Sequence, residues 1–470
     1  MRNFVFNEAM KLRRQTLVKL AKLQIDNNLK AELPKLNKTM LPGPNATYRD
    51  SLYHEREVLM QRIKLYLGLD YEKTKEFELF EIAAKYEEIV SSGEYSAENR
   101  FVQVIKEACD ACPSGKYYAT DLCRNCVAHS CRTVCPKDAI TIEGGRAKIK
   151  PELCVGCGLC AKACNYFAIV KLERPCERAC HVKALKSDKN SAAEIDREKC
   201  VSCASCYVAC PFGAIETPSS MLKVLEELKN GVKLNIIYAP SITAQFGPKV
   251  QTGQVKSAFY KAGFNKVYEV AVGADKVAEE EAEFIEKSDK LVTTSCCPAF
   301  VEYIEKHQQE FTENISPAPS PMAEMAKEID SQEEKTVFVG PCIAKKMEAY
   351  KIGTVDYVLT FEECAVIFIA MGIEPSQFEN METEGSFDGW NFAQSGGVAR
   401  AVENICNKKL TIEKMNGISE GKELFKKAKL EKIDLIEGMA CEGGCICGPG
   451  IMVNPNSAKI ALQRMVLNKG

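Results

Sequence analysis

The stretch CVGCGLCAKACNYFAI occupies residues 154–169, and a related stretch, CVSCASCYVACPFGAI, occupies residues 200–215. Both place their cysteines at the spacing C-x2-C-x2-C-x3-C. The region around them, from Cys109 to Cys210, holds 16 of the 24 cysteines of the chain, with only short segments between them. In a reducing compartment, clustered cysteines at regular spacing indicate metal ligation rather than disulfide bonds. The pattern predicts a small module, repeated twice, that is held together by its metal ligands.

The spacing is a signature of ferredoxins, in which three close thiolates hold one [4Fe-4S] cube and a fourth reaches the neighbouring cube. Each run is also accompanied by a C-x3-C pair and a C-x2-C pair, so that 16 thiols can hold four cubes. The predicted sets are Cys123, Cys126, Cys131 with Cys164; Cys154, Cys157, Cys160 with Cys135; Cys200, Cys203, Cys206 with Cys180; and Cys109, Cys112, Cys176 with Cys210. Several cubes along one chain would form an electron conduit.

Two alternatives remain open for this module. The fourth ligands can be exchanged between the runs, so that Cys210 completes the Cys154 cube and Cys164 completes the Cys200 cube. Pairs of the form C-x2-C would also suit structural zinc. The complete runs, with their trailing cysteine, are much more specific for [4Fe-4S] clusters, which is the interpretation we favour.

The overall composition narrows the classes of partner. The 470 residues carry 62 Lys and Arg against 64 Asp and Glu, a net charge of −2 without a basic block, which argues against nucleic acid and anionic membranes. The longest apolar run, near CAVIFIAMG, is too short to span a bilayer, and MRNFVFNEAMKLRR does not resemble a signal peptide. We therefore expect a cytoplasmic protein whose partners are small molecules or redox proteins.

Other regions flank the cysteine-rich module, which we assign to residues 106–217. Residues 1–105 place apolar side chains three or four positions apart, which predicts a helical region with a packing or docking role. Residues 218–232 include SSMLKVLEELKNG, which predicts a connecting helix. In residues 233–470, short apolar runs alternate with helical patterns, which predicts an α/β domain with largely parallel strands.

Within this α/β domain, chemically special residues follow the strand-like runs. Pro240 and Ser241 follow KLNIIYA, Cys296 and Cys297 follow KLVTTS, Pro341 and Cys342 follow KTVFVG, and Cys441 to Cys445 follow IDLIEGMA; KVYEVAV (266–272) and DYVLT (356–360) are further predicted strands. Ligands of parallel sheets gather beyond the carboxyl ends of the strands, so we expect these loops to form one site. Cys297, Cys342, Cys441 and Cys445 could hold a fifth cube. Cys296 points away from its neighbour and is then free for another task.

Three motifs of this domain, TSCCPAF, GPCIAKKMEA and EGMACEGGCICGPG, resemble those of the [FeFe] hydrogenases, which approximate TSCCPxW, PCxxKxxE and ExxxCxxGCxxGxG. The resemblance covers about residues 233–470, and the ferredoxin-like module also resembles that of the family in its general pattern. Within the family, the chain is most similar to the divergent group B. It implies an oxidoreductase that interconverts H2 with protons and electrons. The electrons would pass through the [4Fe-4S] clusters to or from a soluble carrier such as ferredoxin.

The resemblance implies an H-cluster as the catalytic cofactor. Its cube would be held by Cys297, Cys342, Cys441 and Cys445, and Cys445 would also bridge to a diiron unit. The carbonyl, cyanide and dithiolate ligands of that unit come from maturation proteins, which are therefore expected partners. About four additional [4Fe-4S] clusters would complete the set of cofactors.

The resemblance also implies roles for residues around the diiron unit. Lys345 matches a lysine that hydrogen-bonds an iron cyanide, since a compact ammonium suits a small buried anion. Ser241 and the backbone of Ala239 and Pro240 match the loop that faces the other cyanide. Met439 matches a methionine that packs against the cofactor.

A proton relay is implied as well. Cys296 matches the thiol that exchanges protons with the bridgehead amine of the dithiolate, which is general acid-base catalysis in a dry pocket. Glu281 and Ser316 match the carboxylate and hydroxyl that follow in the relay. Phe284 stands where the next carboxylate of the family lies, so the proton exit beyond Ser316 is left open.

The sequence departs from the family pattern near the site. Gly340 replaces a methionine, Met322 stands where a glutamine is usual, and Cys447 adds a thiol to the third motif. These changes leave every expected iron ligand in place. They put the catalytic bias and the behaviour toward oxygen in doubt.

Three other functions are alternatives. An iron-sulfur assembly factor shares the fold but lacks the relay thiol that Cys296 supplies. A sensor of H2 carries the same H-cluster, usually with a signalling appendage, and none is recognisable here. A plain polyferredoxin electron carrier would use the α/β domain for docking and would show no cyanide or carbonyl infrared bands.

Overall fold

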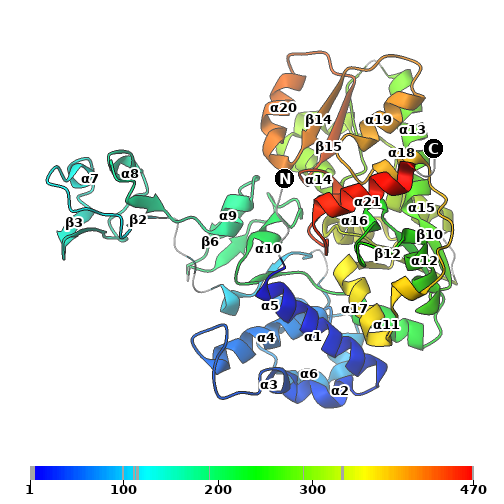
Figure 1. Ribbon diagram of the computed structural model, residues 1–470, viewed down its shortest axis with the longest axis horizontal. Helices are drawn as coiled ribbons and strands as arrows, with labels where there is room; N and C mark the ends of the chain where they lie inside the picture. Colours follow the sequence, from blue (N-terminus) through cyan, green and yellow to red (C-terminus); the bar gives the residue numbers. More distant parts are fainter. Residues whose placement is uncertain are drawn as a thin grey trace.

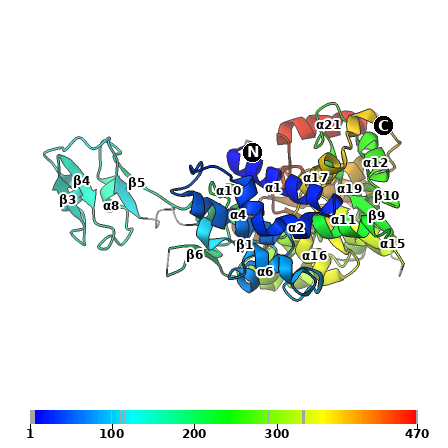
Figure 2. The ribbon, with the colours of Figure 1, turned by 90° about the horizontal axis from the view of Figure 1, so that it is seen from below.

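The computed structural model describes residues 6–97, 100–109, 112, 116–189, 191–288, 290–329 and 333–467. Figures 1 and 2 show one large body and a smaller unit, residues 116–172, that stands away from it. In this described part of the chain, no helix is both long and apolar enough to cross a bilayer. The mixed architecture agrees with the predicted fold class: N-terminal helices, a ferredoxin-like module and an α/β domain.

The N-terminal region is built from helices, as predicted. They are α1 (Glu8–Ile25), α2 (Leu29–Glu32), α3 (Leu36–Met40), α4 (Leu52–Tyr66), α5 (Tyr71–Thr74) and α6 (Leu79–Ala84). Ser51 precedes helix α4, and its side chain accepts a hydrogen bond from the backbone N–H of His54, so the first turn is capped. Helix α1 buries Leu17, Leu20 and Ala21 and packs against α11 (Met221–Lys229) and α17 (Phe361–Met371) of the large body.

A buried ion network joins the N-terminal helices to the rest of the molecule. The Arg13 guanidinium in α1 lies 3.4 Å from Glu216 and 3.3 Å from Glu362, which belong to the cysteine-rich module and to α17. It also lies over the ring of Tyr207, 4.4 Å from the centroid. Arg13, Glu216 and Glu362 are all buried, so this cation holds together three regions that are distant in sequence.

We expect Arg13→Leu to lower the free energy of unfolding by about 3 kcal/mol, because two buried carboxylates would lose a shared cation. Arg14→Leu is the matched control, since Arg14 also contacts Glu362 but its side chain is 29% exposed. The control substitution should lower the free energy of unfolding by less than about 1 kcal/mol. Denaturant unfolding of the anaerobically purified protein, followed by circular dichroism, measures both. Equal losses would show that the network does not depend on Arg13.

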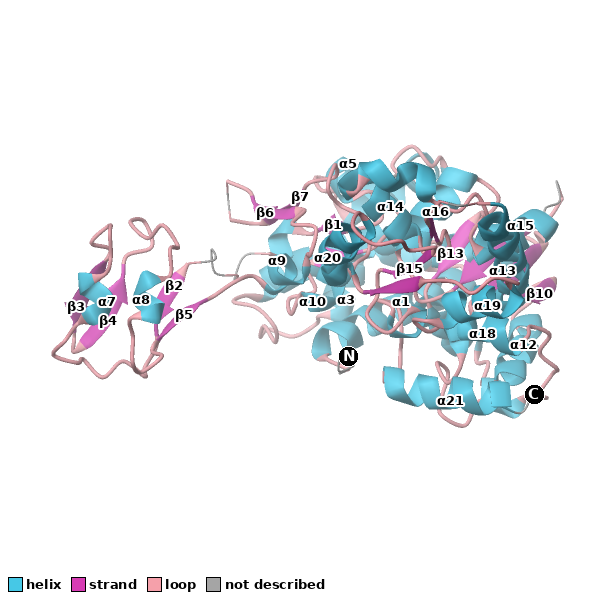
Figure 3. Ribbon diagram, turned by 90° about the horizontal axis from the view of Figure 1, so that it is seen from above, coloured by secondary structure: helices cyan, strands magenta, loops and turns pink. Residues whose placement is uncertain are grey.

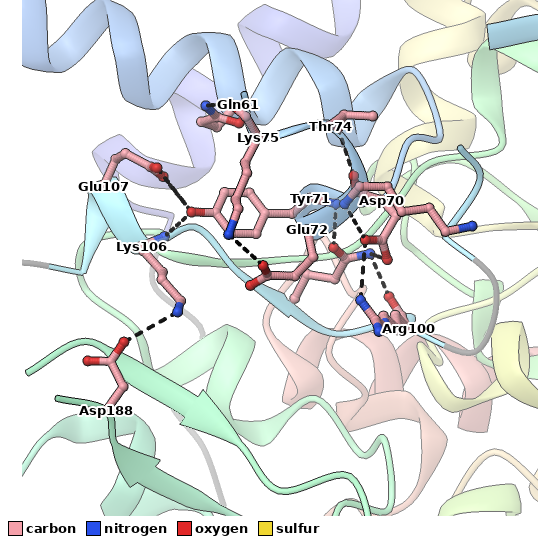
Figure 4. Close-up of polar contacts among 12 residues, drawn as sticks. Gln61, Asp70, Tyr71, Glu72, Thr74, Lys75, Arg100, Lys106, Glu107 and Asp188 are labelled. Atoms are coloured by element: carbon pink, nitrogen blue, oxygen red, sulfur yellow. Dashed lines mark hydrogen bonds and ion pairs between the residues drawn. The ribbon is translucent and has the colours of Figure 1, made fainter. Parts of the chain in front are cut away.

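A second set of contacts fixes the N-terminal region beside Cys109 (Figure 4). The Tyr71 hydroxyl donates to both carboxylate oxygens of Glu107, at 3.0 and 2.9 Å. Lys106 forms an ion pair of 3.3 Å with Asp188 in the cysteine-rich module. The helical region therefore holds the segment that leads into the first predicted ligand.

The cysteine-rich module consists of two repeats of the same small fold. The outer repeat contains β2 (Tyr117–Ala119), α7 (Ser130–Thr133), β3 (Ile140–Glu143), β4 (Arg146–Ile149), α8 (Leu159–Lys162) and β5 (Ile169–Lys171). The inner repeat contains β1 (Gln103–Val104), α9 (Pro175–Ala179), β6 (Leu185–Ser187), β7 (Ala193–Ile195), α10 (Ser205–Ala209) and β8 (Ile215–Glu216). In each, the first strand pairs with the last and the two middle strands pair with each other, all antiparallel. The predicted repeat is therefore present, and only the outer copy stands clear of the body (Figure 1).

The α/β domain contains two parallel sheets. One has the order β10-β9-β12-β13 and the other the order β11-β15-β14. Their bounds are β9 (Leu234–Tyr238), β10 (Lys266–Glu269), β11 (Val292–Thr293), β12 (Lys335–Val339), β13 (Tyr357–Leu359), β14 (Ile412–Asn416) and β15 (Leu435–Met439). The predicted parallel arrangement is confirmed, although it is divided between two sheets.

Two details of the predicted strands were wrong. The strand predicted over residues 266–272 ends at Glu269, because Val270 already begins a long helix that buries Val270, Ala274 and Val277 on one face. Strand β14 was missed. It lies at a sheet edge and its sequence, IEKMN, exposes charged side chains, so its apolar signal is weak.

Helices surround the two sheets (Figure 3). Besides α11 and α17 they are α12 (Thr252–Lys261), α13 (Val270–Lys287), α14 (Pro298–His307), α15 (Pro321–Ile329), α16 (Ala344–Ile352), α18 (Phe387–Asn391), α19 (Gly397–Ile405), α20 (Gly421–Ala428) and α21 (Pro455–Leu467). The expected connecting helix is α11, and Ser219 rather than Ser220 accepts from its first N–H, that of Met221. Helix α13 packs against α15, α18 and α19 and carries Glu281 toward the sheet ends.

Candidate active site

The carboxyl ends of strands from both sheets meet at an apolar cavity. Two of the loops, after β9 and β12, come from the first sheet, and two, after β11 and β15, come from the second. The cavity is lined by Ala239, Pro240, Ser241, Val270, Ala274, Cys296, Cys297, Pro298, Pro321, Met322, Phe338, Pro341, Cys342, Lys345, Phe392, Ala393, Met439 and Cys445. The expected convergence of the strand-end loops is thus present in the structure.

Three of the predicted ligand thiols, Cys297, Cys342 and Cys445, line this cavity, and Cys441 lies close to them. Burial, followed by the charges of Cys342, Cys297 and Cys445, raises the pKa of Cys441 well above its ordinary value. Burial and then Cys297 and Cys342 raise the pKa of Cys445 in the same way. Since such charge effects act over short distances, the four predicted ligands of the fifth cube lie together.

Cys296 lines the same cavity and faces a buried carboxylate. Burial, and after it the charge of Glu281, raises the pKa of the Cys296 thiol well above its ordinary value. Glu281 is fully buried, and its Oε1 accepts from the backbone N–H of Ser295 at 3.2 Å. Burial raises the pKa of Glu281 to about 7, although hydrogen bonds from Ser295 and from the Ser316 side chain lower it. The residues of the predicted relay are therefore neighbours in the order Cys296, Glu281, Ser316.

Lys345 brings a positive charge to the cavity wall from the start of α16. Its Nζ donates to the Ser320 hydroxyl at 2.8 Å and to the Cys296 carbonyl at 3.4 Å, and it pairs with Glu348 at 2.5 Å. Burial disfavours the charge, yet Glu348 raises the pKa of Lys345 above its ordinary value. The ammonium therefore remains charged in an otherwise apolar wall.

The loop after β9 presents a buried hydroxyl to the cavity. Ser241 is 0% exposed, and its Oγ has no hydrogen-bond partner among the residues that the structure describes. Such a buried donor is costly unless a partner binds there. Met439, at the end of β15, is also buried and completes the apolar wall.

The structure explains one departure from the family pattern. A side chain at Gly340 would meet the ring of Phe338 at 2.5 Å, and Phe338 itself lines the cavity. Phe338 therefore occupies space that a residue at position 340 would otherwise fill. The sequence pattern did not indicate that Phe338 fills the space beside Gly340, because Phe338 has the pattern of an ordinary buried strand residue.

The thiols of the ferredoxin-like module form four groups. In the outer repeat, the structure places together Cys123, Cys126, Cys131 and Cys164, and separately Cys135, Cys154, Cys157 and Cys160. In the inner repeat, it places together Cys180, Cys200, Cys203 and Cys206, and separately Cys109, Cys112, Cys176 and Cys210. These groups match the predicted sets. The exchanged pairing is disfavoured, because Cys164 lies in the outer repeat and Cys210 in the inner one.

Across the residues that the structure describes, no three His, Cys, Asp or Glu side chains are placed to hold one metal ion. A zinc ion needs its sulfur ligands about 2.3 Å from a single point. Each thiolate of a cube instead binds a different iron, which requires a wider spacing. The thiol groups are therefore not gathered as ligands of single ions.

The inner repeat lies directly against the candidate active site. A cavity is shared by Cys203 of the inner repeat and by Cys441 and Cys447 of the α/β domain. Cys203 is also one of the charges that raise the pKa of Cys441, after burial and the nearer thiols. The four thiols that include Cys203 are thus the group of the module nearest to the fifth set.

Two acidic residues of the quoted motifs, Glu437 and Glu348, were given no role by the sequence analysis. Glu437 is fully buried in β15, and its carboxylate accepts from the backbone N–H groups of Gly396 and Ala399 at 2.5 and 2.8 Å. It therefore caps the start of α19 beside the relay. The role of Glu348 as a partner of Lys345 could have been inferred, since it lies three residues later on the same helix face.

Comparisons with known proteins agree with this geometry. Residues 232–449 match the family model of the iron-only hydrogenase large subunit, C-terminal domain, and residues 147–170 and 193–216 each match a 4Fe-4S binding domain. The first of the two 4Fe-4S domain matches lies in the outer repeat and the second lies in the inner repeat.

The chain is also similar to curated proteins. It is 28% identical over 311 residues to the periplasmic [Fe] hydrogenase large subunit of Nitratidesulfovibrio vulgaris, covering 51% of this chain and 74% of that protein. It is 28% identical over 308 residues to iron hydrogenase 1 of Clostridium pasteurianum, covering 50% and 53%. A solved structure of [FeFe]-hydrogenase HydA1 from Chlamydomonas reinhardtii aligns with a TM-score of 0.43 at 18% identity, covering 52% of this chain and 88% of that one.

Proposed function

We propose that the chain catalyses the reversible conversion of H2 into protons and electrons, because residues 232–449 match the family model of the iron-only hydrogenase large subunit, C-terminal domain. The observation that carries the proposal is that the Cys296 thiol, Lys345 and three further thiols line one apolar cavity, with Cys441 close to those three. Iron-sulfur clusters follow from the matched domains. That the catalytic cofactor is an H-cluster and that about four further cubes serve it are parts of the proposal.

The residues of the cavity fit such a cofactor. Three thiols of the cavity, together with Cys441 beside them, offer ligands to a cube. The unpartnered Ser241 hydroxyl and the Lys345 ammonium offer hydrogen bonds to bound anions, and the remaining wall is apolar. We assign Cys297, Cys342, Cys441 and Cys445 as ligands, with Cys445 as the bridge to the diiron unit. Ala239, Pro240, Ser241 and Met439 would enclose that unit. When bound, it would supply the open metal position at which H2 is formed or split.

The chain itself would move the proton and exclude water. Cys296 would exchange a proton with the cofactor, and Glu281, with a pKa of about 7, is suited to accept and release it near neutral pH. Ser316 would pass it outward. Lys345 would hold anionic ligands in place, and the apolar wall would keep bulk water away from the reacting atoms.

Electrons would reach the site through the ferredoxin-like module. We propose the division into residues 1–105, 106–217, 218–232 and 233–470, with the cubes in the second part and the H-cluster in the last. A soluble carrier such as ferredoxin and the maturation proteins would be the partners. Within the family we propose the divergent group B, on the basis of the helical N-terminal region and the variant motifs.

Infrared spectroscopy of protein matured with the diiron cofactor tests the proposal. We expect cyanide and carbonyl bands, together with H2 production from reduced methyl viologen. A protein that takes up the cubes but shows no such bands would be an electron carrier. Bands without turnover would favour a sensor of H2.

A further inference from the structure

The two ferredoxin-like repeats contain equivalent loops that differ in how far they are buried. The inner loop, residues 200–206, has the sequence CVSCASC, and the outer loop, residues 154–160, has the sequence CVGCGLC. Because both loops hold equivalent ligand positions, a difference in burial reflects what covers each loop. It does not reflect a difference in the repeat itself.

The inner loop is covered by the α/β domain. Val201 is 1% exposed and belongs to the same buried cluster as Phe300 and Tyr303 of α14. Lys306 of this helix donates to the Cys200 carbonyl at 2.8 Å. This covered loop also contains Cys203, which lies against the fifth set of thiols. It is therefore the point at which the proposed electron path leaves the module.

The outer loop is uncovered. Val155, the counterpart of Val201, is 61% exposed, and Leu159 is 44% exposed. Cys157 is exposed, a property that it shares only with Cys126 among the cysteines of the chain. Figure 2 shows that the outer repeat stands away from the body. A cube held by this loop would be near the surface, with apolar side chains around it.

The two repeats also differ in charge. Residues 116–172 contain nine Lys and Arg against four Asp and Glu, which gives a net charge of +5. Residues 173–217 contain seven of each and are neutral. Lys137 lines the same small cavity as Val155 and Cys157, so the positive charge extends to the uncovered loop. The outer repeat is thus basic in a chain whose net charge is −2.

We propose that the outer loop, residues 154–160, with Lys137 beside it, is the docking surface for an acidic one-electron carrier protein. The proposal rests on the proposed function, since it assumes that electrons enter or leave through the cubes. A cube held by Cys154, Cys157, Cys160 and Cys135 would accept one electron from the reduced carrier, which would be oxidised as the cube is reduced. The reverse transfer serves H2 uptake.

The chemistry of the surface fits a transient partner. Encounters between electron-transfer proteins bury small areas, with a few apolar contacts inside a charged rim. Opposite net charge steers such partners together and makes their association sensitive to salt. Val155 and Leu159 supply the apolar centre, and Lys137 supplies part of the basic rim.

The test uses the cluster-loaded full chain and a small acidic [4Fe-4S] ferredoxin as the probe. We expect Val155→Glu and, separately, Lys137→Glu to raise the KM for the reduced ferredoxin about tenfold. The KM for methyl viologen, a small cation, should not rise. Leu430→Glu, which changes an equally apolar side chain of 86% exposure on the large body, is the control and should alter neither KM.

Several outcomes would overturn the proposal. These are an unchanged KM for ferredoxin in both variants, equal efficiency with a basic carrier, or a dimer of the chain that Val155→Glu dissociates. If H2 turnover is absent altogether, the proposed function is wrong, but docking of the carrier can still be measured. The second-order rate at which reduced ferredoxin bleaches the visible absorption of the clusters should then fall in the two variants and not in the control.

Discussion

Replacing Cys296 by serine should lower the H2 turnover of the matured protein by about 10²- to 10⁴-fold, the range expected for loss of a positioned proton-transfer group. Cys296 is half-buried and lines the cavity, and burial and the nearby Glu281 carboxylate raise the pKa of its thiol. A serine hydroxyl has nearly the same size but releases its proton far less readily than a thiol. Turnover is measured with reduced methyl viologen, at matched cofactor content.

Cys406→Ser provides a matched control. The Cys406 thiol lies next to the same helix, α13, and contacts the Ala282 carbonyl at 3.8 Å, so a hydroxyl can make the same contact. The control should keep its turnover, and both variants should keep the infrared bands of the cofactor. Equal turnover in Cys296→Ser and the parent would remove Cys296 from the relay. Loss of the bands in Cys296→Ser would show a role in holding the cofactor instead.

Much of the candidate site could be predicted because ligand chemistry leaves its mark in sequence spacing. Cys297, Cys342 and Cys441 each follow a strand, and parallel strands bring such positions to one edge. The same reasoning does not reveal that two sheets share the edge. Strand β14 was missed because it is a partly exposed edge strand, and the start of α13 was missed because VAV is apolar in either conformation.

What surrounds a motif could not be predicted from the motif. Val155 and Val201 occupy the same position of the same repeat, yet one is 61% exposed and the other 1%. Their difference depends on tertiary packing with α14, which no local pattern records. The filling of the space beside Gly340 by the Phe338 ring has the same origin, since it depends on how a residue of β12 and a residue just after this strand share a volume. The sequence therefore identified the ligands better than their environment.

Glu281→Gln should have opposite effects on activity and on stability. Glutamine keeps the acceptor for the Ser295 N–H but cannot take up a proton, so turnover should fall by about 10²-fold or more. Stability should rise, because a fully buried carboxylate is costly when ionised. Turnover is assayed as for Cys296, and thermal unfolding of the cluster-loaded protein is followed at about pH 5.5 and about pH 8, values that bracket the pKa of about 7.

The sign of the stability effect follows from the raised pKa. Glu281 titrates at about 7 in the folded chain against 4.5 for an ordinary glutamate, so the parent loses stability as the pH rises from 4.5 through 7. Glutamine does not ionise, and its advantage should therefore grow from about 1 kcal/mol near pH 5.5 to about 3 kcal/mol near pH 8. A residue with a purely structural role would lose stability and activity together. An advantage that is the same at both pH values would show that the Glu281 carboxyl is already ionised at about pH 5.5 in the folded protein, so that its pKa is not raised. Glu281 could not then hold and release a proton near neutral pH.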